Sequence, residues 1–111
     1  KVAASRIKTY IGGGTQWQSV KTSNYTATAG QGVFMNTTSG ALTLTLPASP
    51  SIGDEVTFVD YAGTFDSNNL TIARNSSKIH GAEEDLTVAV ERAANTLVFT
   101  DSTQGWLLKS K

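Results

Sequence analysis

Alternating apolar and polar positions are clearest in the middle of the chain. Leu42, Leu44 and Leu46 alternate with Thr43 and Thr45. Because successive side chains of a β-strand point to opposite faces, this spacing places three leucines on one face and two threonines on the other. The pattern therefore predicts a strand with one face on the core.

The next run, residues 55–61, carries apolar side chains on both faces. Val56 and Phe58 share one side, and Val59 and Tyr61 fall nearly on the other. A turn with two prolines, which cannot donate to a strand ladder, separates this run from the leucine strand. We expect a central strand that is covered on both sides.

Further strands are predicted at short, regular spacing, separated by turn-forming Asn, Ser, Gly and Asp residues. Residues 83–94 could instead be helical, but the β-branched Val88 and Val90 in an alternating pattern favour a strand. We expect an all-β fold, an antiparallel β-sandwich of jelly-roll type with roughly eight to ten short strands. The remaining predicted strands are 17–20, 25–27, 33–36, 70–74, 78–80, 86–90, 96–100 and 105–109.

One domain is predicted from the 111 residues of the chain. Residues 12–14 are three consecutive glycines, whose backbone entropy disfavours any regular element. We interpret residues 1–14 as an N-terminal arm or stalk remnant with a glycine hinge, and residues 15–111 as the β-sandwich domain. Since the sequence begins at Lys1 rather than Met, we interpret it as a domain excised from a longer protein.

The charge balance argues against several classes of partner. Nine basic residues offset nine acidic ones, and no basic run could follow a phosphate backbone, so nucleic acid is not an expected partner. The chain has no cysteine, which excludes disulfides and thiolate chemistry. Its apolar stretches are far shorter than the roughly 20 residues that span a bilayer, so membrane insertion is not expected either.

Catalytic groups are sparse. The only histidine, His80, has no recognisable nucleophile and orienting partner, so we expect a structural or surface role. The acidic pair Asp54 and Glu55 and the acidic run 83–85 have the composition of solvated loops rather than of an acid/base pair. We expect no enzyme activity; a hydrolase or esterase would have to use Asp54, Glu84 or His80.

Metal and modification sites are weakly indicated. Residues 60–66 contain Asp60, Gly63 and Asp66, but the apolar residues between them match a calcium loop poorly. No metal site and no cofactor is therefore expected. Sequons for N-glycosylation arise easily in a chain rich in Asn, Ser and Thr, and glycosylation is left open. They begin at Asn24, Asn36, Asn69 and Asn75.

Aromatic side chains offer the remaining candidate site. Exposed Trp and Tyr residues on a β-scaffold can stack against sugar rings, and Trp17, Tyr25, Tyr61 and Trp106 are the candidates for such stacking. The alternative, which we favour, is that Trp17 and Trp106 pack against each other or against the core and close the fold.

Six motifs occur in order along the middle of the chain. They are NTTSGALTLTLPASP at residues 36–50, GDEVTFVD at 53–60, AGTF at 62–65, NNLTI at 68–72, RN at 74–75 and KIHG at 78–81. With these motifs, the sequence between Trp17 and Trp106 resembles a domain that recurs in tail-fibre and other virion structural proteins of tailed bacteriophages. One departure is Ser76, where the resemblance leads us to expect glycine.

The resemblance implies a β-rich, homotrimeric module of a phage tail fibre or related virion appendage. Its expected roles are assembly with other virion proteins and contact with the host surface, and its expected location is the virion, extracellular after release. A trimer would also explain the modest apolar content of 39%, since neighbours could complete the core. The alternative hypothesis is a carbohydrate-binding module that recognises a polysaccharide of the host cell surface.

Overall fold

The computed structural model describes residues 15–109. The predicted arm and glycine hinge lie outside the described residues, and so do Ser110 and Lys111. The boundary predicted at residue 15 therefore stays a prediction.

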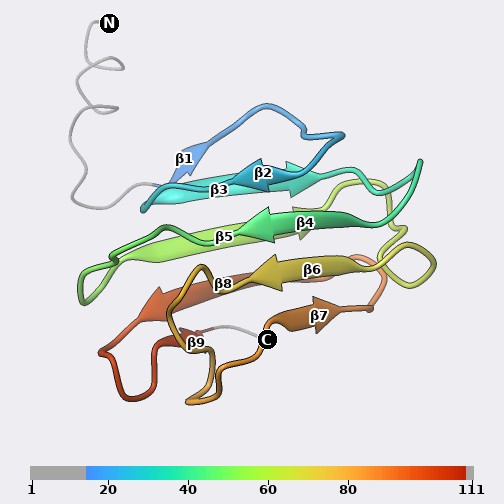
Figure 1. Cartoon of the computed structure of the whole chain (residues 1–111). Coiled ribbons are helices and arrows are strands. Elements are labelled where there is room, and N and C mark those ends of the chain that lie inside the picture. Colours follow the sequence, from blue (N-terminus) through green and yellow to red (C-terminus); the bar gives the residue numbers. More distant parts are fainter. Residues whose placement is uncertain (1–14, 110–111) are drawn as a thin grey trace, which may run out of the picture.

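Nine strands form two sheets within this range, and the two sheets lie in layers (Figure 1). The five-stranded sheet has the order β1-β3-β5-β8-β9, and the four-stranded sheet has the order β2-β4-β6-β7. The all-β prediction is confirmed. The strands are β1 (Gln16–Trp17), β2 (Tyr25–Thr26), β3 (Gln31–Met35), β4 (Leu42–Thr45), β5 (Glu55–Asp60), β6 (Leu70–Ala73), β7 (Leu86–Val88), β8 (Ala94–Phe99) and β9 (Trp106–Leu108).

The chain winds between the sheets rather than folding back on itself. From β1 to β6, each strand lies in the sheet opposite to that of the strand before it, so β1, β3 and β5 pair in parallel, and so do β2, β4 and β6. Only the pairs β5–β8, β6–β7 and β8–β9 are antiparallel. The predicted antiparallel, jelly-roll arrangement is therefore wrong: from β1 to β6 consecutive strands cross to the other layer, and only β6–β7 and β8–β9 pair with their neighbour in sequence.

The core lies between the two sheets. Leu44 and Leu46 are fully buried, which confirms the half-buried leucine strand. Strand β5 is central, as predicted, but only its inner face is buried, through Val56 and Phe58. Tyr61, just beyond the strand, is 50% exposed, so the expectation that both faces are covered is wrong.

The clearest differences between predicted and observed strands concern three segments. The strand predicted over residues 17–20 ends at Trp17. Residues 78–80 form no strand; Ile79 makes only isolated bridges, to Ala82 and to Trp106. The strand predicted over residues 86–90 ends at Val88, and Val90 is exposed in a turn. Residues 83–94 contain no helix, and residues 15–109 contain no helix able to cross a membrane.

Candidate functional site

Two of the four predicted stacking residues are not free at the surface. Trp106 is fully buried, with its ring edge-on to Phe99 at 5.5 Å between centroids. Tyr25 is half-buried, and its hydroxyl donates to Oε1 of Gln31 at 2.9 Å. Nζ of Lys21 lies 4.4 Å from the centroid of the Tyr25 ring. Trp106 therefore cannot stack against a ligand in this structure, and the Tyr25 ring is already engaged.

Trp17 and Tyr61 are accessible. Trp17 is 49% exposed and stacks on Phe34 with ring centroids 4.8 Å apart. Trp17 and Trp106 lie on β1 and β9, the opposite edges of the five-stranded sheet, so they do not pack against each other. The expectation that both tryptophans close the fold is correct for Trp106 and wrong for Trp17.

Trp17 belongs to a larger surface, the outer face of the five-stranded sheet. Because side chains alternate along a strand, the residues between the buried ones point away from the core. Many of these outward residues are apolar and only half-buried, and the sequence analysis did not single them out as a site. The period-two pattern of β5 and β8 could have identified these outward-facing residues from the sequence. The outer face consists of Trp17, Gly32, Phe34, Glu55, Thr57, Val59, Ala94, Thr96, Val98, Leu107 and Lys109.

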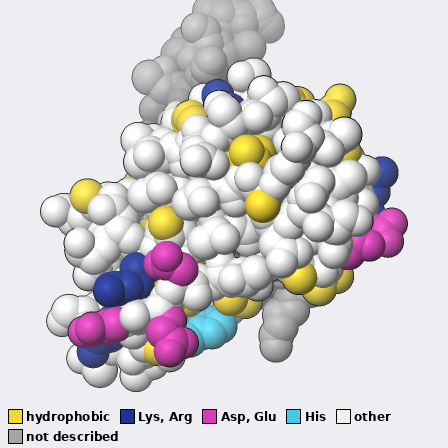
Figure 2. Space-filling view, turned by 45° about the vertical axis from the view of Figure 1, so that its right-hand side comes forward, with side chains coloured by type: hydrophobic (Ala, Val, Ile, Leu, Met, Phe, Trp, Pro, Cys, Tyr) yellow, Lys and Arg dark blue, Asp and Glu magenta, His cyan; other side chains and the backbone are white. Residues whose placement is uncertain are grey.

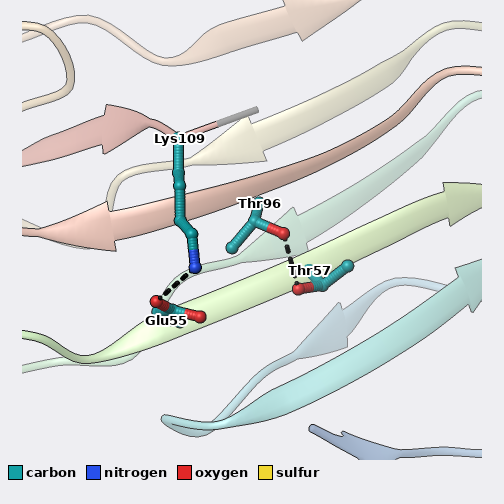
Figure 3. Close-up of polar contacts among 4 residues, drawn as sticks. All are labelled: Glu55, Thr57, Thr96 and Lys109. Carbon is teal, nitrogen blue, oxygen red and sulfur yellow. Dashed lines mark hydrogen bonds and ion pairs between the residues drawn. The ribbon is translucent and has the colours of Figure 1, made fainter. Parts of the chain in front are cut away.

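The polar side chains of this outer face are paired with one another (Figure 3). The hydroxyls of Thr57 and Thr96, on neighbouring strands, are 2.9 Å apart. Nζ of Lys109 donates to Oε2 of Glu55 at 3.0 Å. Both pairs join residues that are far apart in the sequence, so only the fold brings them together.

The outer face of the four-stranded sheet is different. It consists of Thr26, Thr43, Thr45, Thr71, Ala73 and Thr87, which stand opposite one another in two rows. None of these threonine hydroxyls hydrogen-bonds to another group of the described chain. This outer face is polar and uncharged, and it depends on water for its hydrogen bonds.

The acidic candidates serve in turns or face solvent. Oδ2 of Asp54 accepts from the N–H of Ser51 at 2.8 Å. Oδ1 of Asp85 accepts from the N–H of Arg74 at 3.0 Å. Glu84 is exposed. These positions agree with the interpretation of residues 83–85 as a solvated loop. For the first acidic pair the interpretation fits Asp54 but is wrong for Glu55, which begins strand β5 and pairs with Lys109.

His80 completes the edge of the five-stranded sheet. Its backbone N–H donates to the carbonyl of Trp106 at 2.9 Å, and its Nε2 accepts from the N–H of Leu108 at 3.1 Å. The imidazole thereby takes the place that a further strand would take beside β9. This contact agrees with the structural role expected for His80.

Asp60, considered above as a calcium ligand, instead binds backbone. Its two carboxylate oxygens accept four N–H groups, from Gly63, Thr64, Phe65 and Arg92, at 2.9–3.1 Å. Burial raises the pKa of Asp60, but these hydrogen bonds outweigh burial, so the pKa lies below its ordinary value of 3.8. The carboxylate therefore holds two loops together, residues 60–65 and the turn at Arg92.

No group of three or more His, Cys, Asp or Glu side chains within residues 15–109 could hold a metal ion. Figure 2 shows charged side chains of both signs gathered near His80, while most of the remaining visible surface is neither charged nor hydrophobic.

Comparison of the sequence with models of known protein families gave no match, and comparison with curated proteins gave none either.

Proposed function

We propose that this chain is a structural module of a phage tail fibre or related virion appendage, and that it assembles as a homotrimer. Its role is to contribute stability and connection within the appendage and to contact the host surface. The proposal starts from the sequence resemblance. It is supported by the hydrogen bonds that the side chains of the motif residues make to the backbone.

The observation that carries the proposal is that these motif residues hold turns together. Asp60 binds three backbone N–H groups of its own loop and that of Arg92 in a second turn, and Nδ2 of Asn68 donates to the carbonyl of Thr37 at 2.7 Å. Nδ2 of Asn75 donates to the carbonyl of Leu46 at 2.9 Å. Polar groups that are saturated by backbone contacts stabilise loops and are not free for chemistry. This use of the motif fits a module whose function is architecture.

Light scattering coupled to size exclusion tests the proposal on the full chain at micromolar concentrations. The expected result is a mass of three chains that persists on dilution. A single-chain mass throughout that range would overturn the homotrimer.

A carbohydrate-binding module is the second candidate, favoured by the exposure of Trp17 and Tyr61. Both rings are about half exposed, as rings that stack on sugars must be. Binding to a glycan array, lost in Trp17→Ala and Tyr61→Ala but kept in Tyr25→Phe, would support this candidate. An array without signal from the wild-type chain would count against it.

A further inference from the structure

We infer that the outer face of the five-stranded sheet is the surface through which copies of this chain associate. This inference rests on the proposed homotrimer and says which of the two outer sheet faces forms it. The occupant of the surface is a second copy of the same chain.

The first support is apolar surface on four strands, in two rows that lie on either side of the Thr57–Thr96 pair. Phe34 of β3 stands opposite Val59 of β5, and Val98 of β8 stands opposite Leu107 of β9. All four side chains are only half-buried. Removing apolar surface of this kind from water against a partner is favourable.

The second support is that burying this surface would leave few polar groups unpaired. The hydroxyls of Thr57 and Thr96, in the middle of the sheet, already bond to each other at 2.9 Å. A buried polar group without a partner destabilises an interface, because it loses its hydrogen bonds to water. Because the hydroxyls supply each other's partner, a neighbouring chain need not provide one. The same pairing makes the surface a poor sugar site, since sugar hydroxyls need free donors and acceptors beside the stacked ring.

The third support is that the charges of this outer face balance, so the face is compatible with a second copy of itself. This outer face carries one acidic group, Glu55, and one basic group, Lys109, which are 3.0 Å apart. Equal and opposite charges let the same surface of a second copy approach without net repulsion, and each group can exchange partners across the interface. The whole chain is also formally neutral, with nine basic and nine acidic residues.

The other outer sheet face lacks these properties. Thr43, Thr71 and Thr87 stand in one row across three strands, and their hydroxyls have no partner in the described chain. Covering them would remove water from each hydroxyl without a built-in replacement. We therefore expect the outer face of the four-stranded sheet to remain exposed to solvent in the assembly.

The test compares lysine substitutions on the two outer sheet faces of the full chain. Val59→Lys and Val98→Lys change the inferred interface, and Thr71→Lys is the matched control, since Thr71 is also half-buried on an inner strand of its sheet. Mass is measured by light scattering, and folding by circular dichroism and urea unfolding. The two valine sites lie on different strands, so one variant remains informative if the other fails to fold.

We expect the wild type and Thr71→Lys to be trimers, and the folded valine variants to be monomers. Acrylamide quenching of Trp17 should rise with dissociation, because this ring lies on the same outer face. If every variant stays trimeric, or if only Thr71→Lys dissociates, the choice of sheet face is wrong while the homotrimer stands. If the wild type is a monomer, both the proposed homotrimer and the inferred interface are wrong.

Discussion

The indole of Trp17 lies directly over Gly32, so closely that a Cβ on Gly32 would stand 2.6 Å from Cε3 of Trp17. Gly32 is buried by this ring although it lies on the outward side of its strand. Because Gly32 has no side chain, the ring of Trp17, on the edge strand β1, can pack on β3 and stack against Phe34.

Gly32→Ala should displace the Trp17 ring and destabilise the fold by about 1–3 kcal/mol, as overpacking does. Urea unfolding and Trp17 quenching measure the two effects. In a Trp17→Ala background, the same alanine should cost less, because the remaining close atom is Cγ2 of the exposed Thr15, at 2.8 Å. Equal costs in the two backgrounds would mean that the contact between residues 17 and 32 does not limit the substitution.

Asp60→Asn should destabilise the fold by about 1–3 kcal/mol, because an amide offers one acceptor oxygen where the carboxylate offers two, and its NH₂ would face backbone donors. Denaturant unfolding gives the value. The control is Asp66→Asn, at an exposed carboxyl that makes no hydrogen bond within the described residues. It should change stability by less than about 0.5 kcal/mol. Similar losses in the two variants would contradict the role assigned to Asp60.

The stability of the fold should fall in acid, partly because of Asp60. The pKa of this carboxyl in the folded chain is lowered from 3.8, so folding is favoured by its ionisation. The contribution is fully present above the pKa of the unfolded chain and is lost as the pH falls below 3.8 toward the folded pKa. Unfolding measured as a function of pH should therefore slope less in Asp60→Asn than in the wild type. Asp101, whose pKa is lowered mainly by the N–H of Gln104, should leave a residual slope in both.

Ser76→Gly should stabilise the fold by roughly 0.5–1 kcal/mol, since Ser76 has a φ of 77°, in the left-handed region where a Cβ is unfavourable. Asn75, with a φ of 51°, precedes it in the same turn. Thermal unfolding would measure the gain. Ser77→Gly is the control, because Ser77 has no positive φ, and it should bring no gain. A loss of stability in Ser76→Gly would mean that the serine hydroxyl matters more than the backbone.

The turn at Ser76 also illustrates what the motif alone could predict. The resemblance led us to expect glycine at this position, and the structure places a serine there in a conformation that glycine prefers. The backbone of the turn therefore has the form that the expected glycine would favour, at the cost of strain in one residue.

Local alternation was enough to locate most strands. In the leucine strand, the period of two correctly identified Leu44 and Leu46 as buried, because successive side chains of a strand point to opposite faces. The same reasoning placed β5 at the centre of a sheet, since its apolar residues are dense. The same reasoning predicted that the outer face of β5 is buried, which is wrong, because apolar composition alone does not show whether another layer packs on that face.

Pairing, and the surfaces that depend on it, were decided only by the tertiary structure. Alternation is the same in parallel and antiparallel strands, so it could not show that the chain winds between two sheets. Nor could alternation show that Trp17 is exposed and Trp106 buried, although both lie on edge strands of the same sheet. The sequence by itself determined where strands form and which side of each is apolar, because those properties are local. The tertiary structure alone determined which strands meet, since the pairs Glu55–Lys109 and Thr57–Thr96 join residues that only the folded chain brings within hydrogen-bond distance.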